Sequence, residues 1–204
     1  MILNIGVLAS TKATDLQAVI DAIQAKQLNS KISVVVSNKG DAYALERAKK
    51  HNIEAVFINS KDKEREDFDR EVSDVLEKYD VDLILAIGYM RILSGWFVNK
   101  WKNKIMNIHP SLLPAFAGGM DKDVHTEVLK AGVKETGCTL HFVTEEVDSG
   151  PIIMQKKVDV AENETIESLK AKVQKAEQEV IVKALKLYDE GKMKVEGNKV
   201  VISE

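Results

Sequence analysis

The 204-residue sequence has a single cysteine, Cys138, three prolines and no long uninterrupted hydrophobic run. One cysteine cannot form a disulfide within the chain, which fits a reducing compartment. No apolar stretch approaches the roughly 20 residues that a membrane-spanning helix needs. Positive charge is not in excess either: the net charge is −3 and the pI is about 5.9, so nucleic-acid binding is not predicted. We therefore expect a cytoplasmic protein without nucleic-acid or membrane partners.

Short apolar runs alternate with amphipathic stretches through the first part of the chain. The opening MILNIGVLAS has no basic region before its apolar residues, so we interpret it as a first strand and not as a signal peptide. Residues 2–8, 32–37, 55–58 and 82–87 are the predicted strands. Residues 15–27, 42–50 and 64–79 are the predicted helices between them.

The rest of the chain continues this pattern less regularly. Strands are expected over 105–109, 138–143 and 152–158, helices over 124–131 and 165–188, a loop over 117–123 and a small hairpin over 192–203. The sequence therefore predicts an α/β fold: a Rossmann-like, mostly parallel twisted sheet with helices on both faces, in a single domain.

A polar pair marks the end of one predicted strand. In IMNIHPSLLPAF, which begins at Ile105, Asn107 and His109 are two residues apart, so their side chains share a face of the strand. Pro110 cannot donate to a sheet ladder, so the strand should end there, at the edge where open parallel sheets bind ligands. An amide beside an imidazole suits a carbonyl that becomes a tetrahedral oxyanion. For the pair alone, a capping asparagine and a core histidine remain an alternative.

The whole string NIHPSLLPAF resembles the Asn-x-His-Pro-Ser-Leu-Leu-Pro signature of the folate-dependent formyltransferases. A later segment, HFVTEEVDSGPII, resembles the part of that family that carries the active-site aspartate, here Asp148. By itself Asp148 is also compatible with an Asx-turn or a solvated acidic loop. The resemblance runs from about residue 5 to 187. It implies that Asn107 and His109 stabilise an oxyanion while Asp148 orients His109 and relays a proton.

Within this family the chain is most similar to the branch that formylates glycinamide ribonucleotide in purine biosynthesis. The resemblance implies direct transfer of a formyl group from the co-substrate 10-formyltetrahydrofolate to a primary amine. No enzyme nucleophile is needed, and Cys138 is expected in the core. His125 and His141 lack the close spacing of metal ligands, so no metal is expected. We expect one formyltransferase domain over residues 1–204, because other branches carry further domains, and a monomer or homodimer.

The donor pocket is implied by GYMRIL, which begins at Gly88 and matches the family's segment after the fourth strand. Main-chain N–H and C=O groups there read the pterin edge while apolar side chains wall the ring. The acidic loop that contains Asp148 closes the other side. The folate-binding residues implied in this way are Met90, Arg91, Ile92, Leu93, Glu145 and Val147. For Arg91 two roles stay open: pairing with an acidic group of the ligand, or a solvated side chain.

The amine substrate is assigned to other positions by the same resemblance. Arg65, in REDFDRE, matches an arginine expected to contact the ribonucleotide phosphate, and the alternative is an exposed helix start. Gln174 and Glu177 lie three apart on one helix ridge and match the family's Gln-x-x-Glu, in which the glutamate holds ribose hydroxyls. From the residues alone, this pair would be a solvated edge of the helix.

One loop departs from the family pattern. The family has a Gly-rich loop after the first strand, Ser-Gly-x-Gly-Ser-Asn-Leu-Gln, whose backbone amides cradle the phosphate. Here the corresponding positions after Ser10 are Thr11, Lys12, Ala13, Thr14 and Asp15. Side chains hinder close backbone approach and a carboxylate repels phosphate, so Lys12 and the hydroxyls are expected to compensate, with Asp15 as a helix N-cap. A non-catalytic folate- or nucleotide-binding module, or a formyltransferase for another small amine, is the alternative.

Overall fold

A computed structural model describes residues 2–118 and 123–203. The main sheet has seven strands: β1 (Leu3–Leu8), β2 (Ser30–Ser37), β3 (Glu54–Phe57), β4 (Leu83–Ala86), β5 (Ile105–His109), β6 (Glu135–Phe142) and β7 (Ile152–Asp159). Their order is β3-β2-β1-β4-β5-β6-β7. The first five strands are parallel, and β6 and β7 continue the sheet antiparallel. The predicted Rossmann-like fold is confirmed.

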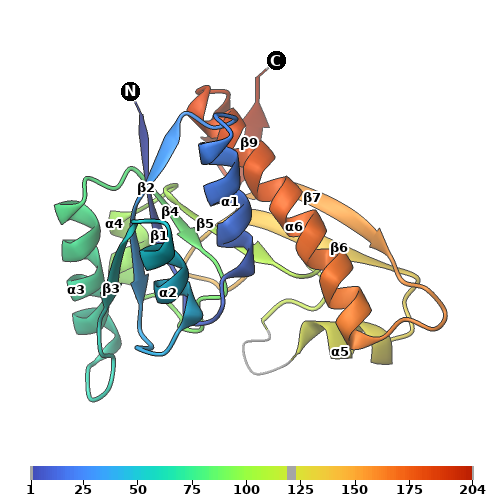
Figure 1. The fold of residues 1–204 in the computed structure, drawn as a ribbon. Helices are drawn as coiled ribbons and strands as arrows, with labels where there is room; N and C mark the ends of the chain where they lie inside the picture. Colours follow the sequence, from blue (N-terminus) through green and yellow to red (C-terminus); the bar gives the residue numbers. More distant parts are fainter. Residues whose placement is uncertain (1, 119–122, 204) are drawn as a thin grey trace.

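Helices cover both faces of this sheet (Figure 1). They are α1 (Thr14–Gln24), α2 (Tyr43–Lys50), α3 (Arg65–Lys78), α4 (Gly95–Lys100), α5 (Val124–Lys130) and α6 (Ile166–Asp189). Buried residues of α1, α2, α5 and α6 pack in one core on one face, while those of α3 pack with residues of and around α4 in a second core on the other. A separate hairpin, β8 (Met193–Glu196) and β9 (Lys199–Ile202), follows α6.

The predicted elements are present with shifted ends, and one helix was not predicted. That helix, α4, is only six residues long, too short for a periodic pattern to emerge. Its N-cap is Ser94, whose Oγ accepts from the Phe97 amide at 3.2 Å. The Ser94 amide in turn donates to Asp69 Oδ2 at 2.6 Å. Burial of Phe97 against α3 then holds the short helix in place.

Strand alternation decides which side chains of β5 face which core. Met106 and Ile108 belong to the core under α1 and α6, whereas Ile105 belongs to the core under α3. Asn107 and His109 therefore share the Ile105 face, at the carboxyl end of the strand. This agrees with the expected orientation of the polar pair. The expected loop over 117–123 includes residues 119–122, which lie outside the described part of the chain.

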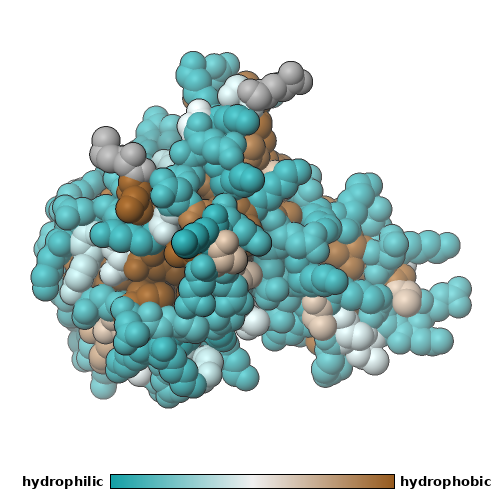
Figure 2. All heavy atoms as spheres, turned by 45° about the horizontal axis from the view of Figure 1, so that its top comes forward, coloured by the Kyte–Doolittle hydropathy of each residue, from teal (hydrophilic) through white to brown (hydrophobic). Residues whose placement is uncertain are grey.

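The surface carries few large apolar side chains. The face seen in Figure 2 is mostly hydrophilic, with hydrophobic residues in separate areas. No helix in residues 2–118 or 123–203 combines the length and the apolar composition needed to cross a membrane. Met90, Ile92 and Val147 are exceptions on the surface, exposed by 44%, 42% and 42%. All three line one cavity.

Candidate active site

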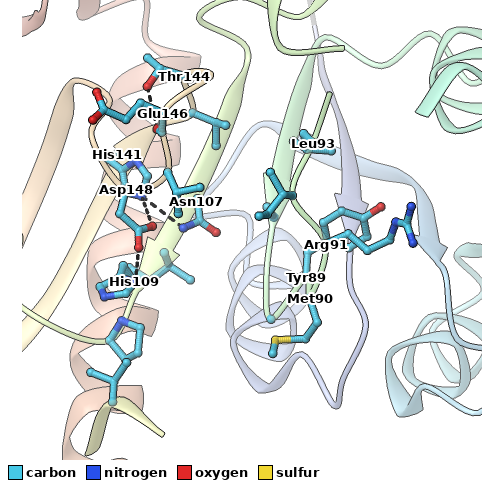
Figure 3. A pocket seen from close by; sticks show the side chains of 18 of the residues that line it. Tyr89, Met90, Arg91, Leu93, Asn107, His109, His141, Thr144, Glu146 and Asp148 are labelled. Carbon is cyan, nitrogen blue, oxygen red and sulfur yellow. Dashed lines mark hydrogen bonds and ion pairs between the residues drawn. The ribbon is translucent and has the colours of Figure 1, made fainter. Parts of the chain in front are cut away.

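The cavity has a volume of about 460 Å³ and lies at the carboxyl ends of β4 and β5. One wall is the segment between β4 and α4, which includes Met90 and Leu93. The facing wall carries Asn107, His109 and Asp148, as Figure 3 shows. The three predicted catalytic side chains thus come together beside the predicted folate segment.

Asp148 is enclosed by its contacts and is not a solvated loop residue, since its side chain is 9% exposed. Its Oδ2 lies 3.4 Å from His109 Nδ1 and accepts from the Gly118 amide at 2.9 Å. Its Oδ1 lies 3.6 Å from His141 Nε2. The solvated-loop alternative is therefore wrong, because the turn after β6 folds the carboxylate back over the sheet edge.

Gly150 makes that turn possible. A Cβ atom at this position would lie 1.8 Å from the Phe142 carbonyl oxygen, far inside contact distance. Asp148 itself has a positive φ of 54°, which an aspartate tolerates better than most residues. The backbone that positions Asp148 thus depends on the Asp-Ser-Gly sequence of the turn.

His109 is held from both sides. Its Nε2 donates to the Phe116 carbonyl at 3.1 Å, while Nδ1 faces Asp148. Burial lowers the pKa of His109 and outweighs the nearby carboxylate, which acts in the opposite direction. The imidazole is therefore neutral around pH 7 and carries its one proton on Nε2, so Nδ1 can donate to Asp148 only after the ring takes up a second proton.

Asp148 remains ionised beside this imidazole. Burial acts to raise its pKa, but hydrogen bonds from His141 and the Gly118 amide, together with the positive charge that either histidine gains on protonation, hold the pKa below its ordinary value. A fixed carboxylate next to a neutral imidazole provides a group that can receive a proton and an orienting partner.

His141 is a site residue whose role the sequence did not define. It lies directly opposite Asn107 in the β5–β6 pairing, and its Nε2 is 3.2 Å from Asn107 Nδ2. Its Nδ1 faces the Phe142 carbonyl, an acceptor, at 2.9 Å, and its Nε2 faces both the Asn107 amide and Asp148 Oδ1. Only one of the two Asn107 N–H groups is used in this contact. The strand register that pairs these residues is not visible in sequence.

All six residues predicted to bind folate line the cavity. The Met90 amide donates to Ser10 Oγ at 2.8 Å, which ties the segment to the end of β1. The Arg91 guanidinium lies over the Phe68 ring, 4.3 Å from its centroid. Glu145 accepts from Asn99 Nδ2 at 2.8 Å, which fastens the acidic loop to α4. The remaining members of the set are Ile92, Leu93 and Val147.

The loop expected to bind phosphate is placed differently. Thr11, Lys12, Ala13, Thr14 and Asp15 are all absent from the cavity lining. Gly88 has a φ of 58°, and a Cβ there would lie 2.4 Å from Thr11 Oγ1, so the loop packs closely on the donor segment. Ala13, not Asp15, is the N-cap of α1, with a left-handed φ of 43°. The N-cap prediction for Asp15 is wrong because α1 begins one residue before it.

Asp15 instead is buried close to Glu177 on α6, and each carboxyl group acts on the pKa of the other. Burial raises the pKa of Asp15 to about 6, and burial together with the charge of Asp15 raises the pKa of Glu177 well above its ordinary range. The two carboxyl groups therefore share one proton at neutral pH. Each residue is 6% exposed, so the solvated-edge alternative is wrong for Glu177, because α1 covers this ridge of α6.

The remaining substrate candidates are spread over two elements. Gln174 is half-buried on α6, one turn before Glu177. Arg65 is exposed at the first position of α3, where its charge and that of Arg91 both act on Asp69. Neither Arg65 nor Gln174 nor Glu177 is among the residues that line the cavity.

Two other side chains complete the description. Cys138 is fully buried, and burial raises the pKa of its thiol to about 12, which agrees with a core residue. His125 lines the cavity from α5. Within residues 2–118 and 123–203, no three His, Cys, Asp or Glu side chains form a group that could hold a metal ion.

Comparison with known proteins identifies the family. Residues 3–185 match the formyl transferase family. The chain belongs to this family. It is 40% identical over 196 residues to the phosphoribosylglycinamide formyltransferase of Haemophilus influenzae, which covers 96% of this chain and 91% of that protein. The resemblance inferred from the signature string is confirmed.

Two further relatives show the scope of the match. The trifunctional purine biosynthetic protein adenosine-3 of Bos taurus is 43% identical over 196 residues, 96% of this chain, but the chain spans only 19% of that longer protein. The crystal structure of glycinamide ribonucleotide transformylase 1 from Symbiobacterium toebii aligns with a TM-score of 0.95 at 39% identity. That alignment covers 100% of this chain and 95% of the other.

Proposed function

We propose that this chain is a phosphoribosylglycinamide formyltransferase: it transfers the formyl group of 10-formyltetrahydrofolate to the amine of glycinamide ribonucleotide, a step of de novo purine biosynthesis. The observation that carries the proposal is the convergence of Asn107, His109 and Asp148 on one cavity whose facing wall is apolar. Residues 1–204 then act as one cytoplasmic domain, a monomer or homodimer, with the folate as co-substrate and no metal.

The reaction begins with attack of the substrate amine on the formyl carbon. A tetrahedral intermediate forms, and the formyl oxygen gains negative charge. The N–H of Asn107 that does not contact His141 points to this oxygen, because the amide is held at the cavity edge by its other N–H. His109 supplies a second donor when its Nε2–H leaves the Phe116 carbonyl for the oxyanion.

Collapse of the intermediate breaks the bond between the formyl carbon and the folate nitrogen. The attacking amine must lose a proton and the leaving nitrogen must gain one. Asp148 is ionised and lies within 3.4 Å of His109, so it receives the proton from the amine and returns it, through a water molecule, to the folate nitrogen. No covalent enzyme intermediate is involved.

The folate lies along the donor wall, where Met90, Ile92 and Val147 present apolar surface and the backbone of residues 90–93 reads the pterin edge. Arg91, which lines that wall, offers positive charge to an acidic group of the ligand. The ribonucleotide occupies the other side, toward α6, where Gln174 and Glu177 approach the ribose and residues 11–15 approach the phosphate.

One observation favours an alternative function: the loop of residues 11–15 does not line the cavity. Another small amine could then be the acceptor, or the chain could bind folate or nucleotide without catalysis. The deciding experiment incubates purified protein with 10-formyltetrahydrofolate and glycinamide ribonucleotide and measures formylated ribonucleotide and tetrahydrofolate together. Stoichiometric formation of both supports the proposal. Folate binding without turnover, or transfer only to another amine, contradicts it.

A further inference from the structure

The donor segment, residues 88–93, belongs to no helix or strand, so neighbouring elements must hold its backbone. The Met90 amide donates to Ser10 Oγ at the end of β1, at 2.8 Å. Just beyond the segment, the Ser94 amide donates to Asp69 Oδ2 on α3, at 2.6 Å. Asp69 is fully buried and does not line the cavity. A carboxyl group inside the second core thus anchors one end of the proposed folate wall.

Two buried polar atoms beside this anchor have no hydrogen-bond partner within residues 2–118 and 123–203. They are Asp69 Oδ1, an acceptor, and the Tyr89 hydroxyl oxygen. Figure 3 shows this hydroxyl pointing away from Asn107 and His109, so it is not directed at the reacting groups. A buried polar atom without a partner is unfavourable in free energy, and most such atoms in proteins are paired. A donor and an acceptor left unpaired near each other therefore require an explanation.

The packing around α3 brings the Tyr89 side chain close to Asp69. Tyr89 packs against the same core as Phe68, the residue before Asp69. The Arg91 guanidinium, from the same segment, lies over the Phe68 ring at 4.3 Å from its centroid. Burial raises the pKa of the Tyr89 phenol, and the charge of Asp69 raises it further. The hydroxyl therefore keeps its proton and is a hydrogen-bond donor within range of the carboxyl group.

We propose that Asp69 is a positioning residue for the formyl donor: when the folate fills the cavity, the Tyr89 hydroxyl donates to Asp69 Oδ1 and fixes the donor segment against α3. This inference rests on the proposed function. Tyr89 lines the cavity, so a folate that packs against it pushes its hydroxyl toward the carboxyl group. The two atoms, which do not contact each other in the structure, then satisfy each other. Because this contact forms only in the bound state, it contributes to folate affinity.

The test uses Tyr89→Phe, which removes only the hydroxyl. Binding of tetrahydrofolate is measured by calorimetry without the amine substrate, so the result does not depend on turnover. We expect about 5- to 10-fold weaker binding. Tyr79→Phe, at a tyrosine that packs against the same core outside the cavity lining, should bind normally. The urea midpoint of ligand-free Tyr89→Phe should stay unchanged or rise, because the hydroxyl has no partner there, whereas loss of a purely structural hydrogen bond would lower it.

A double-mutant cycle identifies the partner of the hydroxyl. Asp69→Asn keeps one oxygen for the Ser94 amide and replaces the other with an NH₂ group, so it should also weaken folate binding. Tyr89→Phe should then add little to that loss, because the contact is already broken.

The transfer assay separates positioning of the donor from a general defect. In Tyr89→Phe the KM for the folate should rise, while kcat and the KM for the ribonucleotide stay unchanged. Unchanged tetrahydrofolate binding in Tyr89→Phe, or additive losses in the double variant, overturns the inference. Folate binding that depends on both side chains, without formyl transfer to glycinamide ribonucleotide by the unmodified protein, overturns the proposed function alone. Absence of folate binding by the unmodified protein overturns both.

Discussion

The two sides of the site differ in how they are built. On the side of the formyl chemistry, Asn107 and His109 stand at the end of β5 and Asp148 on a turn held by Gly150, so all three line the cavity. On the acceptor side, Asp15 and Glu177 are buried against each other between α1 and α6. The chemical side carries the signature string and the Asp-Ser-Gly turn that resemble the family pattern, whereas the acceptor side has Thr11 and Ala13 where that pattern has glycines.

The largest effect is expected on the chemical side. Alanine at Asn107 or His109 should lower kcat by roughly 100-fold or more, because each removes an oxyanion donor, with modest effects on KM. Asp148→Asn should fold normally and lose most activity. Steady-state kinetics with both substrates measure this, and His51→Ala, a histidine outside the cavity lining, is the control. Near-normal kcat in any of the three variants would refute the proposed roles.

The second prediction concerns the carboxyl pair on the acceptor side. Burial raises the pKa of Asp15 from its ordinary 3.8 to about 6. The folded state therefore binds the proton more tightly, and stability is lost as pH rises from about 4 through 6. Asp15→Asn should raise the free energy of unfolding by roughly 1–3 kcal/mol at pH 8, and by little at pH 4. Urea unfolding at the two pH values measures the difference.

An exposed carboxylate on the same helix is the control for that experiment. Asp21 lies on the solvent side of α1, so Asp21→Asn should change the free energy of unfolding by less than about 0.5 kcal/mol at either pH. If Asp15→Asn changed the free energy of unfolding equally little at pH 8, the two carboxyl groups would not share a buried proton.

The third prediction concerns backbone strain in the altered loop. Ala13 has a φ of 43°. This left-handed backbone conformation is unfavourable by about 1 kcal/mol or more for a residue that has a Cβ atom. Ala13→Gly should therefore raise the free energy of unfolding by up to about 1 kcal/mol. Ala22→Gly, in the interior of the same helix, should lower it by a similar amount or more, because the backbone there is helical. The same sign for both variants would contradict the left-handed cap.

The smallest effect is expected for Lys12. Its exposed ammonium lies outside the cavity lining. Its attraction to a phosphate is therefore screened by the ions of the solvent. Lys12→Ala should raise the KM for the ribonucleotide by about two- to five-fold at low salt, with kcat unchanged and the effect lost at high salt. Lys26→Ala is the control, since this exposed lysine lies two residues beyond the end of α1. An unchanged KM for the ribonucleotide in Lys12→Ala at low salt would contradict this contact.

Much of the chemical side was predictable because it depends on local rules. A period of two places Asn107 and His109 on one face, and Pro110 ends the strand at the sheet edge. The position of Asp148 was predictable only through resemblance, since loop composition by itself is also that of a solvated turn. His141 was not predictable, because its contact with Asn107 depends on the register between β5 and β6.

Sequence by itself determined the succession of strands and helices, the polar pair at the end of β5 and the formyl transferase signature, since periodicity and motif spacing are properties of neighbouring residues. Only the tertiary structure decided that Asp15 faces Glu177, that residues 11–15 stay outside the cavity and that Lys170 and His125 line it. These contacts join α1 to α6 and α5 to α6, elements that are distant in the chain. The packing of helices over the sheet brings them together, and no local rule of sequence specifies that packing.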